Sequence, residues 1–210
     1  MIERLVPAMV VTVATSADLL EAELFEEEER ALGRAVDKRR REFVTGRACA
    51  RRALERLGMP ATAVASGAHG EPLWPRGVVG SITHCERYRA CAVARAQDAR
   101  SLGIDAEPHA PLPAGVLEAV ASADERRALA TSVSGVCWDR VLFSAKEAVF
   151  KAWYPLTRRG LAFDDVDVRI DRRGGTFRAA LVSADATPTE LRGRWSVAGG
   201  IVATAVVVAW

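Results

Sequence analysis

The chain has 210 residues, of which half are hydrophobic and 27% are charged, so it is long enough for one large domain or for two small lobes around a shared core. Its net charge of +2 excludes bulk charge as a sign of nucleic-acid binding, although residues 21–29 are acidic and residues 37–56 are rich in arginine. Such a local basic patch favours a phosphorylated ligand or an acidic partner surface. The four cysteines form no CxxC pair, which is typical of reduced thiols in a cytosolic protein.

Neither end of the chain carries a targeting or membrane-spanning pattern. The N-terminal segment holds charges early and has no long apolar stretch, so we expect no signal peptide. The apolar run 199–210 is far shorter than the ~20 residues that span a bilayer, and its valine, isoleucine and threonine content predicts a buried strand. We therefore expect a cytoplasmic protein that does not associate with membranes.

In the first half of the chain, the hydrophobic pattern predicts a strand, two helices and two further strands. Glutamates begin the first helix, where the helix dipole favours anions. The second helix ends before Gly58 and carries Arg47 and Arg51 four residues apart, so these two side chains project together. The expected elements are 8–14, 24–36, 37–57, 78–82 and 88–95.

The second half is expected to contain a strand, two short helices, one long helix and three further strands. The long helix has an apolar stripe at helical spacing. The expected elements are 101–105, 115–121, 124–130, 138–153, 165–170, 176–182 and 195–208.

The two halves resemble each other in their pattern. Phe43, Arg47 and Arg51 return a hundred residues later as Phe143, Glu147 and Lys151. Any two amphipathic helices align in this way, so the repeat alone is weak. It nevertheless suggests two similar lobes, 1–102 and 103–210, with a site between them for a ligand that carries several phosphates.

Three short clusters contain the residue types that carry chemistry. Asp105 and Glu107 alternate along an extended segment, so both carboxylates point the same way, which suits Mg²⁺. By itself this pair is better explained as solvated acids at the end of a strand. Glu147 and Lys151 share one helix face, as an ordinary surface ion pair worth ~0.3–0.5 kcal/mol would, or as a metal ligand or base beside a phosphate contact. His84 follows a strand and could be a core group, a base or a phosphate ligand.

Taken together, these clusters resemble the 4′-phosphopantetheinyl transferase superfamily, and in particular its enterobactin-synthesis-type and actinobacterial broad-specificity members. The paired G-I-D-x-E and K-E-A-x-x-K signatures, about forty residues apart, are the most specific part of the resemblance. It covers nearly the whole chain, through segments 38–43, 70–72, 74–75, 80–85, 103–108, 138–140, 145–148 and 192–195.

The resemblance implies an α+β fold of two pseudo-symmetric lobes with the active site in the cleft between them. The implied reaction is the Mg²⁺-dependent (or Mn²⁺-dependent) transfer of 4′-phosphopantetheine from coenzyme A to a serine of apo acyl or peptidyl carrier proteins. The implied metal ligands are Asp105, Glu107 and Glu147, and the catalytic residues are Glu147, Lys151 and Asp105. The implied contacts to coenzyme A are Arg39 and Arg47 for the phosphates at the adenosine end, Ser81, Thr83 and His84 for the phosphate site, Lys146 and Lys151 for the pyrophosphate, and Phe143, Phe150 and Leu161 for the pantetheine channel.

The chain departs from the family pattern in two places. Ser66 and His69 stand at or near positions where relatives often carry lysines, which could weaken the grip on coenzyme A. Glu26 replaces a proline ahead of two glutamates, a change expected to affect only the start of a helix.

Two other functions remain open at this point. One is a non-catalytic module that binds coenzyme A or a carrier protein on the same fold. The other is a nucleic-acid binder that uses segment 38–41, against which the near-neutral net charge and the acidic residues count. We expect a monomer whose carrier proteins dock on arginines near the long helix, namely Arg126, Arg127, Arg158 and Arg159.

Overall fold

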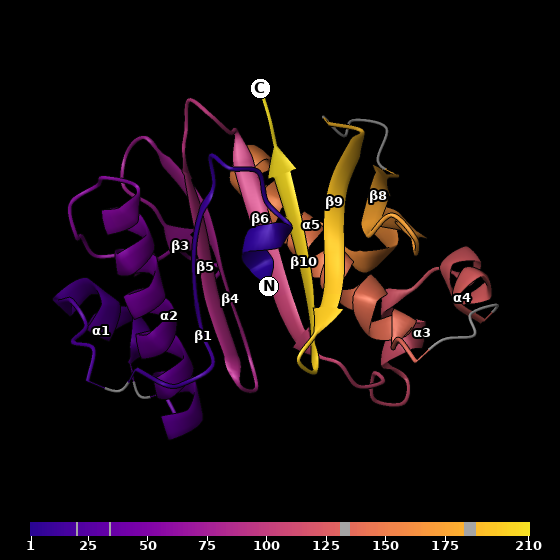
Figure 1. Cartoon of the computed structure of the whole chain (residues 1–210), viewed down its shortest axis with the longest axis horizontal. Helices are drawn as coiled ribbons and strands as arrows, with labels where there is room; N and C mark the ends of the chain where they lie inside the picture. The colour runs from indigo at the N-terminus through magenta and orange to yellow at the C-terminus, as the bar shows by residue number, and fades with distance from the viewer. Residues whose placement is uncertain (20, 34, 131–134, 183–187) are drawn as a thin grey trace.

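The computed structural model describes residues 1–19, 21–33, 35–130, 135–182 and 188–210. Two antiparallel sheets lie side by side, with helices packed on them (Figure 1). The three-stranded sheet has the order β1 (Val11–Thr15), β5 (Tyr88–Arg95), β4 (Val78–Cys85). The five-stranded sheet has the order β6 (Ser101–Pro108), β10 (Ile201–Val208), β9 (Glu190–Ala198), β8 (Thr176–Leu181), β7 (Val166–Asp171). The expected α+β class is therefore confirmed.

The remaining elements divide between these two sheets. The N-lobe consists of the three-stranded sheet, α1 (Glu26–Leu32), α2 (Asp37–Arg56) and the short hairpin of β2 (Ala65–Ser66) and β3 (Pro72–Leu73). The C-lobe consists of the five-stranded sheet, α3 (Val116–Val120), α4 (Ala123–Ala130) and α5 (Trp138–Thr157). Single 3₁₀ turns lie at Ile2–Arg4 and Phe163–Asp165. Within the described residues, none of the helices is both long enough and apolar enough to cross a membrane.

Most predicted elements are present, but the prediction of a single strand over 195–208 is wrong. The chain turns back at Gly199 and Gly200, whose φ angles are 58° and 76°, and Ala198 pairs with Ile201 across this two-residue turn. Both central positions of such a turn need positive φ, which glycine adopts without strain. The segment therefore forms β9 and β10, and β9 begins earlier, at Glu190. The first predicted helix is also shorter than 24–36 because it ends at Gly33.

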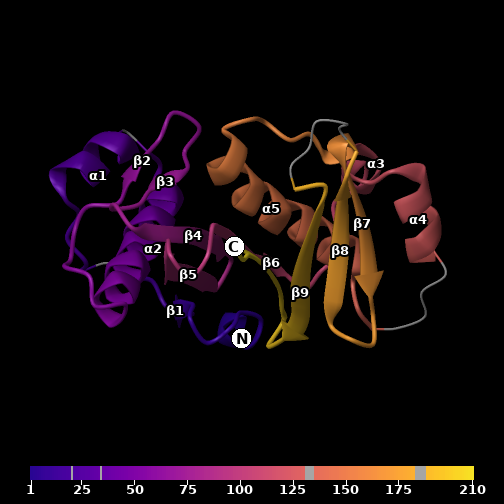
Figure 2. The ribbon, with the colours of Figure 1, turned by 90° about the horizontal axis from the view of Figure 1, so that it is seen from above.

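Helix α5 packs directly on the backbone of β6, as Figure 2 illustrates from above. Gly103 permits this approach, because a Cβ atom there would lie 2.0 Å from the carbonyl oxygen of Ala148 and 2.6 Å from the amide nitrogen of Ala152. Alanines 145, 148 and 152 and Val149 form the buried face of the helix. This packing sets the distance between the helix that carries Glu147 and the strand that carries Asp105.

Strands β4 and β6 lie beside each other where the two lobes meet, yet they belong to separate sheets (Figure 1). Two side-chain hydroxyls take the place of backbone acceptors across this junction. The amide of Ile104 donates to Oγ of Ser81 at 3.1 Å, and the amide of Ala106 donates to Oγ1 of Thr83 at 2.9 Å. We call this junction the seam.

Candidate active site

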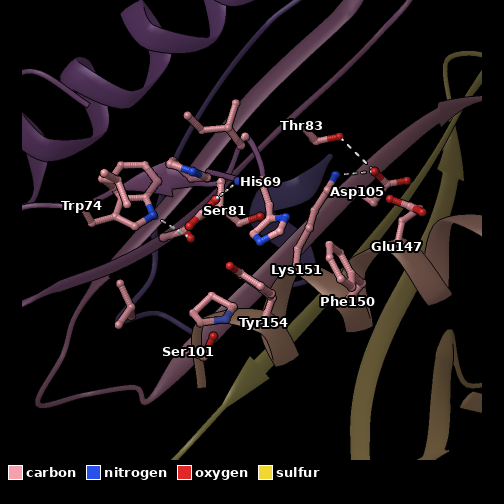
Figure 3. A pocket seen from close by; sticks show the side chains of 18 of the residues that line it. His69, Trp74, Ser81, Thr83, Ser101, Asp105, Glu147, Phe150, Lys151 and Tyr154 are labelled. Atoms are coloured by element: carbon pink, nitrogen blue, oxygen red, sulfur yellow. Dashed lines mark hydrogen bonds and ion pairs between the residues drawn. The ribbon is translucent and has the colours of Figure 1, made fainter. Parts of the chain in front are cut away.

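A cavity of about 610 Å³ lies between the lobes (Figure 3). Strand β4 and the β2–β3 hairpin form its N-lobe wall, and β6 and α5 form its C-lobe wall. Most of the residues expected from the sequence to form the site line it, namely Ser81, Thr83, His84, Asp105, Glu107, Glu147, Phe150 and Lys151.

Asp105 is the centre of the acidic group. It is 4% exposed, and its Oδ1 accepts hydrogen bonds from Nζ of Lys151 at 2.7 Å and from Oγ1 of Thr83 at 3.3 Å. Its Oδ2 is buried and has no hydrogen-bond partner. Figure 3 shows its carboxylate beside that of Glu147, which comes from α5.

The two other carboxylates are harder to ionise than ordinary glutamates. Burial and, next, the charge of Asp105 raise the pKa of Glu107, although Arg140 donates to its Oε2 at 2.9 Å. Burial also raises the pKa of Glu147; Lys151 opposes this shift and Asp105 adds to it. The charge of Asp105 thus destabilises the charged forms of both glutamates inside the cleft, an arrangement that a cation would relieve.

The carboxylate oxygens of the cleft suit a divalent cation whose coordination the protein supplies only in part. Among the described residues, no three acidic, histidine or cysteine side chains form a closed cluster of metal ligands. Cationic side chains instead engage one oxygen of Asp105 and one of Glu107. The buried Oδ2 of Asp105, without a donor, is the atom that most needs a cation, and hard carboxylate oxygens are the ligands that Mg²⁺ prefers.

Basic residues of the N-lobe approach the cavity from β4 and α2. Nη1 of Arg39 donates to Nε2 of His84 at 3.1 Å, and Nδ1 of this histidine faces Glu42 at 3.4 Å. Burial lowers the pKa of His84, Glu42 opposes this shift and Arg39 adds to it. The neutral ring therefore accepts from Arg39, and its proton sits on Nδ1.

Arg47 lies behind this wall and does not line the cavity. It is 5% exposed, stacks over the ring of Phe43 at 4.3 Å and donates to Oγ of Ser66 at 2.9 Å. Burial lowers its pKa to about 10, which still leaves it charged at neutral pH. Its Nε is buried without a hydrogen-bond partner.

Besides Arg39 and Arg47, three more of the residues expected to bind coenzyme A lie outside the cavity lining. Lys146 precedes Glu147 by one residue, and the helix turns it about 100° away, where it donates to Oε2 of Glu125 at 2.8 Å. The ring of Phe143 packs against that of Phe163, at 6.0 Å between centroids. Leu161 packs against the apolar core of the C-lobe.

Two family models match this chain, and each match covers most of one lobe. The family model described as the 4′-phosphopantetheinyl transferase N-terminal domain matches residues 27–94, and that of the 4′-phosphopantetheinyl transferase superfamily matches residues 101–205. The chain is 49% identical to 4′-phosphopantetheinyl transferase Svp of Streptomyces mobaraensis, over 100% of this chain and 89% of Svp. It is 45% identical to Npt of Nocardia iowensis, over 100% of both chains, and 44% identical to PptT of Mycobacterium tuberculosis, over 96% of this chain and 97% of PptT.

The chain belongs to the 4′-phosphopantetheinyl transferase superfamily. The resemblance drawn from its motifs is confirmed. Each matched segment supplies one wall of the transferase cleft, because 27–94 contains His84 and 101–205 contains the three acidic residues.

At one end of the transferase cleft, sequence reasoning named His69 and Arg158 for other roles and assigned no role to Glu71 or Tyr154. The ring of His69 meets the ring of Tyr154 edge-on at 5.6 Å, and Nη1 of Arg158 lies 3.4 Å from Oε1 of Glu71. We call these four residues the clasp, because they join the β2–β3 hairpin to the end of α5. Their helix members could have been found, since Phe150, Tyr154 and Arg158 continue the face of Glu147 and Lys151 at intervals of three or four residues.

Proposed function

We propose that this chain transfers the 4′-phosphopantetheine group of coenzyme A to a serine hydroxyl of apo acyl or peptidyl carrier proteins, which yields the holo-carrier protein and adenosine 3′,5′-bisphosphate. One observation carries this proposal. Carboxylates from a strand and from a helix gather with Lys151 in a cleft between lobes, in a chain of this family. Surface acids that only solubilise a protein have no reason to converge from separate segments.

Asp105, Glu107 and Glu147 are assigned as the ligands of Mg²⁺, or of Mn²⁺ in its place. Bound there with the pyrophosphate of coenzyme A, the ion would neutralise charge that develops as the phosphate ester breaks. The unpartnered Oδ2 of Asp105 and the raised pKa values of the two glutamates support this assignment.

Glu147 is assigned as the base that takes the serine proton. The serine oxygen forms a bond to the β-phosphorus, the bond from that phosphorus to the oxygen of adenosine 3′,5′-bisphosphate breaks, and the proton passes to the carboxylate. The carboxylate of Glu147 lines the cavity beside Lys151, where a general base for an incoming serine hydroxyl has to lie. Lys151 is assigned to the leaving oxygen, because its Nζ lies beside Asp105.

The N-lobe is assigned to the other phosphates of coenzyme A. His84 lines the cavity and is hydrogen-bonded to Arg39, and Arg47 supplies charge from behind them. Phe150 is assigned to the pantetheine arm because it lines the cavity. Lys146, Phe143 and Leu161 are assigned to the support of α5 and not to contacts with coenzyme A.

Together with this function we propose the other features expected from the sequence, namely the lack of nucleic-acid binding, the localisation, the oligomeric state and the two lobes. The arginines of segment 38–41 are engaged by other side chains, Arg40 by Glu29 and Arg41 by Asp18, which supports a protein that does not bind nucleic acid. We further propose a cytoplasmic monomer of two lobes. The expected lobes are 1–102 and 103–210, but β6 begins at Ser101 and the gap between the two matched segments spans 95–100, which favours a boundary a few residues earlier.

Mass spectrometry of an apo-carrier protein incubated with coenzyme A, Mg²⁺ and the chain tests the function. The expected result is a mass gain of one phosphopantetheine group, which EDTA prevents and excess Mg²⁺ restores. A folded Glu147→Gln variant should lose this activity. Binding of coenzyme A without any mass gain on several carrier proteins would favour the non-catalytic module instead.

A further inference from the structure

Ser81 and Thr83 have a shared task at the seam. Both are buried, at 3% and 2% exposed, and each accepts a hydrogen bond from a β6 amide. Without these acceptors, two amides at the edge of β6 would be buried without partners, which proteins avoid. The hydroxyls therefore hold β4 against β6.

Thr83 makes one contact that Ser81 does not. A hydroxyl can accept and donate at the same time, and Thr83 accepts from Ala106 while it donates to Oδ1 of Asp105. The same oxygen accepts from Lys151. One carboxylate oxygen is thus held by two donors from opposite walls of the cleft (Figure 3).

The other oxygen of Asp105 has no donor, although the residue is 4% exposed. It lies on the side of Glu147, where a second carboxylate repels it (Figure 3). Fixing Oδ1 prevents the carboxylate from rotating to exchange its two oxygens. The unpartnered oxygen is thereby kept facing the position that a cation would occupy.

We propose that Thr83 is a positioning residue that orients Asp105 for the divalent cation. This inference rests on the proposed function, because it concerns the same metal site. It gives Thr83 a role different from the phosphate contact expected from the sequence, since its single proton is already donated to Asp105. Groups that hold a metal ligand in this way typically change metal affinity by about 10–100-fold when removed.

The test is titration of Mn²⁺ into the protein with coenzyme A present, followed by calorimetry, on a set of matched variants. Thr83→Val keeps the shape and removes the hydroxyl, and we expect it to lower the affinity for Mn²⁺ by about 10–100-fold. Thr83→Ser keeps the hydroxyl and should restore most of the affinity. Thr204→Val makes the same exchange on β10 opposite Asp105, where the hydroxyl donates to the carbonyl of Ser144, and should leave the affinity near that of the wild type.

Ser81→Ala measures what a loosened seam does by itself, because it removes the acceptor of the Ile104 amide without touching Asp105. Thr83→Val should lower the affinity for Mn²⁺ several-fold more than Ser81→Ala does. Equal losses in these two variants, or an unchanged affinity in Thr83→Val, would overturn the inference. The proposed function fails on a separate result, namely a wild-type protein that modifies no carrier protein with or without metal.

Discussion

Each lobe contains a buried glutamate that joins a helix start, a long helix and another segment, and the corresponding oxygens of the two glutamates make the same kinds of contact. We call each set of contacts a brace. In the N-lobe, Oε2 of Glu28 accepts from the amide three residues earlier and from a cation of the long helix, while Oε1 accepts from the amide of Val64. In the C-lobe, Glu125 repeats this pattern with Val168 as the strand amide. The cations are Arg51 of α2 at 2.7 Å and Lys146 of α5 at 2.8 Å.

The cleft-facing sides of the lobes do not repeat. The N-lobe lines the cleft with His84, which is hydrogen-bonded to Arg39, whereas the C-lobe lines it with carboxylates and Lys151. The comparison shows that the two lobes repeat their buried glutamate contacts. The residues proposed to bind substrate and metal differ between the lobes and lie on the surfaces that face the cleft. The motif repeat visible in the sequence does not coincide with the braces, because it aligns Arg51 with Lys151, whereas the brace cations are Arg51 and Lys146.

The cations of the two braces differ in their exposure to solvent, and this difference leads to the largest predicted effect, a loss of stability. The side chain of Lys146 is 2% exposed and that of Arg51 is 13% exposed. Glu125→Ala leaves a buried cation without its carboxylate and should lower the free energy of unfolding by about 3–5 kcal/mol. Each cation keeps a bond to one backbone carbonyl, that of Phe163 for Lys146 and that of Glu23 for Arg51. Glu28→Ala should cost less, about 2–3 kcal/mol, because the more exposed Arg51 can be partly solvated by water.

Urea denaturation followed by circular dichroism measures both values. Glu55→Ala serves as the control, since this residue is exposed on α2 and its removal should change stability by no more than about 0.5 kcal/mol. A larger loss for Glu28→Ala than for Glu125→Ala would contradict the argument from burial.

Glu125 and Glu147 belong to one lobe, but replacing each with glutamine should change the unfolding temperature in different directions. Because burial raises the folded-state pKa of Glu147, its ionised form opposes folding at neutral pH in the absence of metal. Glu147→Gln should therefore unfold at the same temperature as the wild type or a higher one, whereas Glu125→Gln should unfold at a lower one. As the pH falls through the raised pKa, the wild-type residue takes up a proton and the advantage of Glu147→Gln should shrink.

Thermal unfolding with EDTA between pH 4 and pH 8 provides the measurement. Added Mg²⁺ and coenzyme A should stabilise the wild type more than Glu147→Gln, which lacks one carboxylate of the proposed metal site. A Glu147→Gln variant that is less stable than the wild type at pH 8 would assign this residue to the bracing of the lobe instead.

The clasp is the exposed connection between lobes and predicts the smallest effect. The side chain of Arg158 is 63% exposed, so its pair with Glu71 contributes no more than about 1 kcal/mol and is screened by salt. Arg158→Ala should raise KM for coenzyme A by up to about fivefold at low salt and by less at high salt. Arg159→Ala, which removes the neighbouring charge outside the clasp, should instead raise KM for the carrier protein.

Steady-state kinetics at two salt concentrations separates these two arginines. If Arg158→Ala changes KM for the carrier protein and leaves KM for coenzyme A unaltered, the clasp does not control the cleft.

How far the sequence determined this site depends on the range of each interaction. Strand β5 and the carboxylate pair on β6 follow from patterns a few residues long, so they could be predicted. The second role of Thr83 could not, because it depends on Asp105, which lies 22 residues away. Glu28 was likewise assigned only to the start of a helix, yet it is wholly buried and joins three segments. These contacts arise from the packing of separate elements, and the hydrophobic periodicity of a single segment does not predict them.

Gly103 is a position at which any substitution should impair this enzyme, because the backbone of α5 lies against it. Real Cβ atoms keep at least 3.0 Å from other heavy atoms, and one added here would lie 2.0 Å from the carbonyl oxygen of Ala148. A single methyl group would thus push the helix with Glu147 back by about 1 Å from the strand with Asp105. In a saturation library selected for activity, codon 103 should tolerate only synonymous changes, although this residue contacts no substrate through a side chain.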